Sequence, residues 1–363
     1  MLEDVANLKP IGAHELELIR DIYLPLHADT HGKAAIGMDA AIAFTGTPHA
    51  RRLFVPESRE VMDHLFRVVE AVDIELQKGA TRFRVEHDGR SYRAQCGQSA
   101  TGRDIQLRVL PASVPMLNEL QMPATWRGMM LSDTLFGGGL LLIAAPQGQG
   151  KTTTASSLVA SRLSRFGGMA NTFEDPIELP LQGVWGQKGL CIQRPIEMSD
   201  SPGYDSYGHA MLNSLRQFPV VGGTTILFIG EIMDGSAAVE ALKAAANGHL
   251  VVATIHGRSI EAALRRMVML CCTRLDGMTE ISIRELLAEV LRGIFHQRLV
   301  WTLKGTGWSA AEIEGEFAWS EEPDTPVADA VRSGSVSALR QAIRAQAGVP
   351  GSAHVGGDVV AGA

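Results

Sequence analysis

The sequence is poor in the features that mark small secreted domains, zinc ribbons and membrane-spanning proteins. Its 363 residues include four cysteines, and their spacing gives no C-x-x-C pair, which argues against a zinc ribbon or a thioredoxin-like site. The longest apolar runs have the length of a strand and fall short of the roughly 18–20 residues that cross a bilayer. A fold without disulfides or structural metals must therefore rest on a large hydrophobic core.

Positive charge is in deficit as well. The chain has 33 lysines and arginines against 40 aspartates and glutamates, a formal net charge of -7. An overall basic footprint for nucleic acid is absent, so we predict no direct nucleic-acid binding. The acidic start at Met1–Asp4 has no apolar run, unlike a secretory signal, and the sparse cysteines fit a reducing compartment. We therefore expect a cytoplasmic protein that reaches a membrane only through a partner.

What the chain does contain is typical of a globular protein, with 45% hydrophobic and 20% charged residues. At roughly 100–200 residues per domain, the length predicts two domains. Prolines gather near residues 111–123, and proline resists both helix interiors and central strands. The predicted organisation is an N-terminal α+β domain over 1–110, a linker over 111–123, an α/β domain over 124–335, and a C-terminal helix with a flexible tail over 336–363.

Short apolar strands alternate with helical patterns in the second domain. This alternation predicts a parallel sheet with helices on both faces. The predicted strands are 140–144, 226–229 and 250–255, and the predicted helices are 151–166, 236–246, 259–272 and 281–297. In the first domain the spacing predicts helices over 14–24 and 58–76, and a strand over 104–110 where apolar and polar residues alternate.

The strongest local motif is Ala145-Pro146-Gln147-Gly148-Gln149-Gly150-Lys151-Thr152, which fits the phosphate-binding loop pattern with alanine in its first position. Glycines let such a loop turn its amides toward a phosphate, and the following helix directs its positive end at the same anion. Lys151 would reach the β- and γ-phosphates of ATP, and Thr152 would bind Mg²⁺. The alternative is a glycine-rich turn that contains Lys-Thr by chance, and the flanking strand and helix argue against it. The predicted nucleotide contacts are Pro146, Gln147, Gly148, Gln149, Gly150, Lys151, Thr152 and Thr153.

Two acidic segments follow predicted strands, where they are placed to orient water or hold Mg²⁺. Glu231 comes directly after the buried strand 226–229, at the edge where ligands bind in open α/β sheets. Glu174 begins the run Glu174-Asp175-Pro176-Ile177-Glu178, and three carboxylates so close repel one another unless a cation lies nearby. The alternatives are a helix-start charge for Glu231 and a solvated turn for the Glu174 segment.

Two histidines flank the third strand of this domain. His249 opens the strand and His256 closes it, seven residues on. A lone histidine is usually a structural residue, but His256 falls at the carboxyl edge, where the phosphates are expected. We therefore take His256 as the stronger catalytic candidate and His249 as the weaker one.

Four motifs stand in order along residues 139–256: the phosphate-binding loop, "FEDPIE", "ILFIGEIMD" and "NGHLVVATIH". Together they resemble the nucleotide loop, aspartate box, Walker B box and histidine box of the secretion and pilus motor ATPases. That family includes type IV pilus retraction ATPases, type II secretion ATPases, and the conjugative and type IVB secretion ATPases. The resemblance extends more weakly to "RSYRAQ" and "IQLRVLPASVPMLNELQMP" before the motifs and to "LAEVLRGIFHQRLVW" after them.

The resemblance implies a RecA-like P-loop motor domain with a parallel sheet, preceded by a smaller PAS-like α+β domain. It implies a homohexameric ring in which ATP and Mg²⁺ bind between the two domains. The expected partner is an inner-membrane platform protein of a pilus or secretion system, contacted from the cytoplasmic face of the bacterial inner membrane.

The resemblance also assigns roles to single residues. Arginines of the first domain reach the nucleotide in this family, and Arg93 and Arg108 are the candidates, with exposed strand arginines as the alternative. The remaining roles carried over are Glu174 as the base of the aspartate box, Glu231 as the Walker B acid, and His256 and His249 as the residues that couple nucleotide state to movement.

The chain departs from the family near these motifs. Met233 stands where the family usually has arginine, two residues after Glu231. Leu212 takes the place of an arginine in the preceding helix, although Arg216 remains. The stretch 219–225 is longer than usual and lacks a common aspartate. These changes remove positive charge but leave the motifs themselves, so hydrolysis is still expected.

Three functions are compatible with these residues. The first is a hexameric ATP-hydrolysing motor for type IV pilus dynamics, type IV secretion or conjugative transfer, and the absence of a four-cysteine zinc subdomain favours its retraction, conjugative and type IVB branches. The second is a nucleotide-bound structural or accessory subunit that hydrolyses weakly, which the missing arginines favour. The third is a monomeric P-loop kinase for a small metabolite, in which the histidine box has no role.

Overall fold

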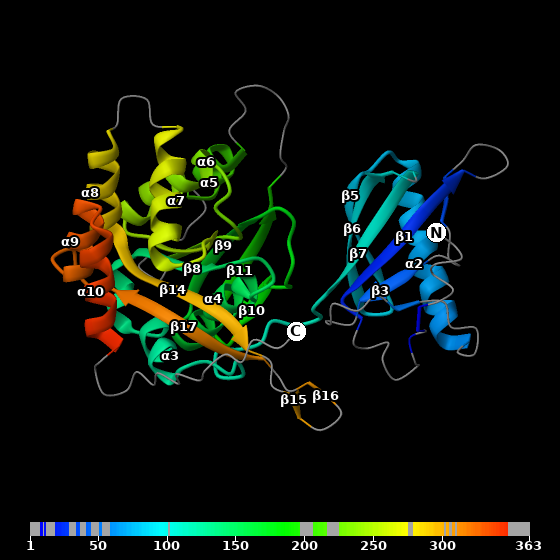
Figure 1. The fold of residues 1–363 in the computed structure, drawn as a ribbon, viewed down its shortest axis with the longest axis horizontal. Helices are drawn as coiled ribbons and strands as arrows, with labels where there is room; N and C mark the ends of the chain where they lie inside the picture. The colour runs from blue at the N-terminus through cyan, green and yellow to red at the C-terminus, as the bar shows by residue number, and fades with distance from the viewer. Residues whose placement is uncertain are drawn as a thin grey trace. The chain divides into compact units, whose positions relative to one another are not determined.

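The computed structural model describes residues 8–9, 11, 19–28, 34–36, 41–44, 51–52, 59–100, 102–196, 206–215, 225–274, 279–300, 303–304, 307–308 and 311–347. The first part of the helix predicted over 14–24, residues 14–18, and the tail over 348–363 lie outside these residues. The chain divides into two compact units, Met1–Ser113 and Val114–Ala363, which Figure 1 draws in colours running from blue at the N-terminus to red at the C-terminus. Among the helices described, none has both the length and the hydrophobicity needed to cross a membrane.

The first unit is an antiparallel sheet with a helix packed on one face (Figure 1). Its elements are β1 (Asp21–Ala28), β2 (Ala34–Ile36), β3 (Ile42–Phe44), β4 (Arg51–Arg52), α2 (Arg59–Gln77), β5 (Arg82–His87), β6 (Arg90–Ser99) and β7 (Gly102–Leu110). The strand order is β4-β3-β1-β7-β6-β5, with β2 paired to β1. Val68 and Val72 of α2 share a buried core with Ile105 and Leu107 of β7. The small α+β domain expected from the sequence is confirmed.

The helix predicted over 14–24 is wrong in its described part, because β1 begins at Asp21. Ile22 and Leu24 are buried, whereas Asp21 and Tyr23 are half-buried, so apolar positions alternate with a period of two. β1 pairs with β3 over its first residues and with β7 along the other edge. This pairing on both sides selects the strand over the helix.

The second unit is a mostly parallel sheet with helices on both faces (Figure 1). Its elements are α3 (Ala124–Met130), the 3-10 helix η3 (Asp133–Gly137), β8 (Gly139–Ala145), α4 (Lys151–Phe166), β9 (Gly168–Glu174), β10 (Gly183–Trp185), β11 (Gly189–Pro195), α5 (Ser206–Leu215), β12 (Thr225–Ile229), α6 (Gly235–Ala246), β13 (Leu250–His256), α7 (Ile260–Cys272), α8 (Glu280–Val290), β14 (Leu291–Val300), β15 (Leu303–Lys304), β16 (Gly307–Trp308), β17 (Glu312–Trp319), α9 (Pro326–Ser333) and α10 (Val336–Ala347). The strand order is β10-β11-β9-β12-β13-β8-β14-β17. Strands β11 through β14 in this order run parallel, and β10 and β17 pair antiparallel at the edges.

Alternate residues of β8 enter two separate hydrophobic cores. Leu140, Leu142 and Ala144 pack with residues of α5 to α10 on one face, whereas Leu141 and Ile143 pack with residues of α3 and α4 on the other. A strand buried on both faces explains the unbroken apolar run in the sequence. The fold class expected for this domain, a parallel sheet with helices on both sides, is confirmed.

The segment predicted as a linker, 111–123, belongs mostly to the second unit. The boundary between the units falls immediately before Val114. Leu117 and Met122 are buried in the core beside α4, and the Leu117 N–H donates to Ser161 Oγ on α4 at 2.9 Å. Helix α10, predicted as part of a separate C-terminal segment, likewise packs into this unit's core.

The helix predicted over 281–297 is right only for its first part. α8 ends at Val290 and passes into β14 without a connecting residue; Leu291 closes the helix by donating its N–H to the Leu287 carbonyl. A Cβ on Gly293 would lie 2.7 Å from the Trp319 ring. Because β17 approaches so closely, the strand needs a glycine at this position. A helix here would have no such requirement.

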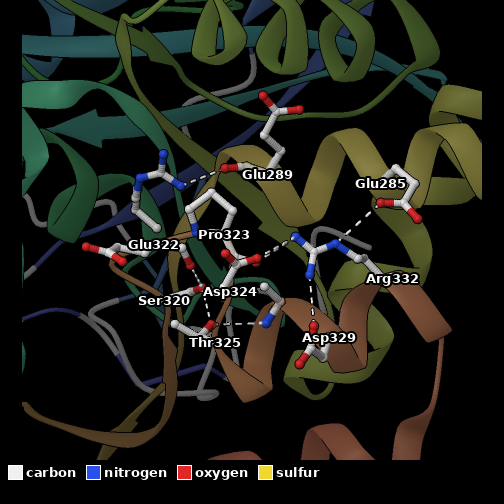
Figure 2. A network of polar contacts seen from close by, with 11 residues as sticks. Glu285, Glu289, Ser320, Glu322, Pro323, Asp324, Thr325, Asp329 and Arg332 are labelled. Carbon is white, nitrogen blue, oxygen red and sulfur yellow. Dashed lines mark hydrogen bonds and ion pairs between the residues drawn. The ribbon is translucent and has the colours of Figure 1, made fainter.

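Arg332 on α9 joins α8, α9 and the turn after β17 (Figure 2). Its Nη1 lies 2.8 Å from Asp329 Oδ1, its Nε lies 3.3 Å from Glu285 Oε2, and its Nη2 donates to the Pro323 carbonyl oxygen at 2.6 Å. Both carboxylates are largely exposed, so each ion pair contributes little. The bond to the half-buried Pro323 connects α9 to the turn after β17.

Candidate functional site

The loop between β8 and α4 has the backbone that a phosphate-binding loop requires. Gly148 and Gly150 both have a φ of 75°, a left-handed conformation that residues with side chains rarely adopt. Gly150 is the N-cap of α4 and offers no side-chain cap, and the first turn of the helix has no acidic residue. The positive end of α4 is therefore left for an anion to neutralise. These residues fit the phosphates of a nucleotide.

Lys151, the first residue of α4, is 7% exposed. Its ammonium donates to the Pro146 carbonyl oxygen at 3.1 Å and to Nδ1 of His256 at 3.3 Å. Burial lowers the pKa of Lys151, and the charges of Glu231 and Glu178 oppose that shift. A buried ammonium held by a carbonyl and an imidazole, neither of which is anionic, is only partly compensated. Phosphate oxygens are ligands that would complete its environment.

His256 connects Lys151 to the carboxylate of Glu231. Its Nε2 lies 2.9 Å from Oε1 of Glu231. The structure thus brings three predicted residues into one row of ammonium, imidazole and carboxylate, each from the carboxyl end of a different strand.

Glu174 ends β9, the strand beside that of Glu231, and is 2% exposed. Gln193 Nε2 donates to its Oε1 at 2.9 Å, and Oε2 has no hydrogen-bond partner among the described residues. Burial raises the pKa of Glu174, against the opposing effect of hydrogen bonds from Thr172 and Gln193. A Cβ on Gly230 would lie 3.1 Å from Glu174 Cγ. Glu174 therefore abuts the residue that precedes Glu231.

We expect Glu174→Gln to change how the stability of the protein depends on pH. Because burial raises the pKa of Glu174 in the folded state, the folded state holds this proton more tightly than the unfolded state. The stabilisation from this proton is complete below the ordinary pKa of glutamate, and it is lost as pH rises through the raised pKa of Glu174 in the folded state. As pH rises from about 4 to 8, the Tm of the wild type measured by calorimetry should therefore fall relative to the Tm of E174Q.

The exposed Glu289→Gln on α8 is the matched control for this titration. Its Tm difference from the wild type should stay level over the same pH range. If the difference between the wild type and E174Q were equally level, Glu174 would not hold its proton more tightly on folding.

His249 does not join the row of Lys151, His256 and Glu231. It precedes β13 at the opposite, amino edge of the sheet, where its carbonyl accepts a hydrogen bond from Gly139 N at 3.0 Å. Its Nδ1 lies 2.8 Å from Thr225 Oγ1, and burial lowers the pKa of His249. Within one chain this placement does not support a catalytic role, which stays a prediction from the resemblance.

Arg93 and Arg108, both in the first unit, are directly opposite each other on β6 and β7, so their side chains share one face of the sheet. Arg84 on β5 is opposite Arg93 in the same register. Their neighbours along the strands enter the core under α2, so the arginines line the other face. Arg108 is 46% exposed and its Nε donates to Asp21 Oδ1 at 2.7 Å. Their contribution to a nucleotide site stays a prediction.

Other residues singled out from the sequence fall into two groups. Thr152 and Thr153 follow Lys151 in the first turn of α4 and are half-buried, and Met233 is 43% exposed. Outside the described residues lie Arg216, the stretch 219–224 and the side chain of Leu212.

Sequence reasoning missed Gln297, which the structure places against the phosphate-binding loop. Gln297 lies on β14, in the part of the chain predicted as helix, and its Nε2 donates to the Gln149 carbonyl oxygen at 2.6 Å. Two features of the sequence argued against a helix in this part of the chain. Gly293 inside the predicted helix is unfavourable by about 1 kcal/mol, and the residues after it suit a strand as well as a helix.

Comparison with known sequences finds the family described as Type II/IV secretion system protein, which matches residues 47–332. The type II secretion system protein E of Pectobacterium carotovorum subsp. carotovorum is 28% identical over 309 residues, which are 83% of this chain and 56% of the relative. The chain therefore spans about half the length of such curated relatives.

Two solved structures share the fold. The ATPase DotB of Legionella pneumophila superposes with a TM-score of 0.63 at 20% identity, covering 91% of this chain and 86% of DotB. The pilus retraction motor PilT with bound ADP superposes with a TM-score of 0.59 at 23% identity, covering 96% of this chain and 89% of PilT. These matches confirm the expected fold, a mostly parallel α/β domain preceded by a smaller α+β domain.

Proposed function

The chain belongs to the Type II/IV secretion system protein family, and on that premise we propose that it is an ATP-hydrolysing motor of a pilus or secretion machine. The observation that carries the proposal is the row of Lys151, His256 and Glu231 beside a loop whose backbone fits phosphates. A shared fold alone would not specify the chemistry. The row supports the proposed chemistry, because a cation that could bind phosphates and a carboxylate that could orient water lie at the same edge of the sheet.

In the proposed complex the backbone N–H groups of residues 147–153 surround the β- and γ-phosphates. Lys151 exchanges the Pro146 carbonyl and His256 for phosphate oxygens. The described residues hold no group of three or more His, Cys, Asp or Glu side chains arranged for a metal ion. The Thr152 hydroxyl would hold Mg²⁺, as the phosphate-binding loop pattern implies, and the remaining ligands would be phosphate oxygens and water. When bound, Mg²⁺ neutralises charge on the phosphates. The ADP bound in PilT supports a nucleotide at this loop.

Hydrolysis requires a carboxylate that orients the attacking water. We assign this role to Glu231, at the end of the row. Glu174 ends the neighbouring strand, beside the residue that precedes Glu231. Its raised pKa lies nearer the range in which general bases work. Arg93 and Arg108 would stabilise negative charge that develops on the γ-phosphate.

The proposed assembly is a homohexamer at the cytoplasmic face of the inner membrane, bound to a platform protein of a type IV pilus, type IV secretion or conjugation system. A second candidate is a weakly hydrolysing accessory subunit of such a machine. Met233 favours it, because this exposed, uncharged side chain stands two residues after Glu231, where the resembled family carries an arginine.

Three measurements on the purified chain test the motor. It should release phosphate from ATP with Mg²⁺, bind a fluorescent ATP analogue, and show the mass of a hexamer when ATP is present.

Lys151→Ala should weaken nucleotide binding by about 10²–10³-fold, because it removes a preorganised cation from the phosphates. Lys243→Ala on α6, an exposed lysine paired with Glu240, is the matched control and should bind like the wild type. A wild-type chain that stays strictly monomeric with ATP would rule out the motor.

A further inference from the structure

We infer that Gln297 is a positioning residue that sets the orientation of one peptide in the phosphate-binding loop, through its hydrogen bond to the Gln149 carbonyl. The inference rests on the proposed nucleotide site and adds to it a residue from outside its motifs. Gln297 Nε2 donates to the Gln149 carbonyl oxygen at 2.6 Å. The Leu299 N–H donates to Oε1 of Gln149 at 2.8 Å. β14 thus holds Gln149 at its backbone and at its side chain.

The strand geometry fixes Gln297 at this place. Phe295 belongs to the core beside α4, and Leu299 packs against the same core, so Gln297 between them shares that face of β14. The register pairs His296 with Ala144 near the end of β8, which puts Gln297 next to the start of the loop. Gln297 is 0% exposed. Its amide is therefore held by packing and does not exchange its partner for water.

The bond selects one of two orientations for the peptide between Gln149 and Gly150. In a planar trans peptide the carbonyl and the following N–H point in opposite directions. Since the Gln149 carbonyl is drawn toward β14, the Gly150 N–H points away from β14. The reversed peptide would present a partly negative carbonyl oxygen to the phosphates. Gly150 has the conformational freedom to permit either, so a contact outside the loop must decide.

The surroundings of Gly150 show that the loop lies directly against β14. A Cβ on Gly150 would lie 3.4 Å from Gln297 Nε2 and 3.4 Å from Leu299 Cδ1. Gln297 Oε1 has no hydrogen-bond partner among the described residues. Turning the amide over would set Oε1 against the Gln149 carbonyl, two acceptors without a proton between them. The chemistry thus fixes Nε2 as the atom that faces the loop.

The test is Gln297→Glu, which keeps the size of the side chain and removes the donor. Gln346→Glu is the matched control, since Gln346 also bonds backbone, donating to Trp319 O at 2.7 Å and accepting from Trp319 N at 2.9 Å. Calorimetry should show that Q297E binds ADP about tenfold more weakly than the wild type, the effect of one misdirected hydrogen bond. Q346E should bind ADP like the wild type, whatever each variant does to the Tm.

Three outcomes would overturn the inference. The first is ADP binding by Q297E equal to the wild type, and the second is an equal loss in Q297E and Q346E, which would reflect stability alone. If Q297E does not fold, Gln149→Leu, a substitution at a half-buried position, should still bind ADP about threefold more weakly than the wild type. Unchanged ADP binding by this variant is the third outcome that would overturn the inference. If the wild type itself bound no ADP, the proposed function would fail first and this inference with it. That result is distinct, because the wild type would then match Lys151→Ala.

Discussion

Replacing Glu231 by glutamine is expected to slow ATP hydrolysis by about 10²–10⁴-fold in a chain that still binds ADP. The amide has the size of the carboxylate, so the contact with His256 Nε2 at 2.9 Å keeps its geometry while the negative charge disappears. Without that charge the attacking water is no longer oriented or activated. Phosphate release at saturating ATP measures the loss, and the affinity for ADP shows that the loop remains intact.

Glu240→Gln provides the matched control for this substitution. It makes the same change of charge on α6, where Glu240 pairs with Lys243, and should hydrolyse ATP at the wild-type rate. Equal rates for the wild type and E231Q would mean that Glu231 does no chemistry. That result would favour the accessory subunit over the motor.

Arg162→Ala should cause the largest loss of stability, about 3–5 kcal/mol in the free energy of unfolding. Arg162 lies fully buried on α4, where Nη1 donates to the Met130 and Ser132 carbonyl oxygens, each at 3.0 Å. Its guanidinium also lies 4.8 Å from the centre of the Phe166 ring and 5.7 Å from that of Phe136. Burial lowers the pKa of Arg162 to about 10, so it remains charged at neutral pH. Alanine would leave a cavity and two carbonyls without their donor.

Urea unfolding followed by tryptophan fluorescence measures this effect, because Trp126 is buried in the same core beside α4. Arg165→Ala is the control: Arg165 lies on the same helix, 4.9 Å from the centre of the Phe166 ring, but is exposed. It should change the unfolding free energy by no more than about 0.5 kcal/mol. Similar losses for both arginines would show that the aromatic contact matters, and that the buried bonds to α3 do not.

The loop and the row beside it could be predicted because their determinants are local. A short apolar strand, two glycines that accept positive φ and a helix start all lie within the residues from β8 to α4. Glu231 and His256 each follow a buried strand of the same sheet. Parallel strands end at one edge, so the sequence alone brings these side chains together.

Strand geometry alone argues against His249 as a member of the same site. It opens the strand that His256 closes, and at about 3.3 Å per residue that separates them by roughly 23 Å. The resemblance kept His249 as a candidate where strand geometry argues against a shared site within one chain.

Gln297 was beyond local reasoning for a different reason. The stretch over α8 and β14 contains strong helix formers, and propensity gives way when neighbouring strands supply hydrogen bonds along an edge. β14 is a strand because β8 and β17 pair with it on either side, and β8 is remote in sequence. A contact between Gln149 and Gln297 is therefore a property of the folded sheet alone.

The direct passage from α8 into β14 connects this helix to the strand that carries Gln297. Leu291 closes the helix on Leu287 and opens the strand at once, and the pairing with β8 shifts register between Leu291 and Gly293 before the strand reaches Gln297. If the proposed nucleotide site holds, thermodynamic linkage works both ways: a protein that bound α8 and shifted β14 would alter the affinity for ADP, and ADP would alter the affinity for that protein by the same factor.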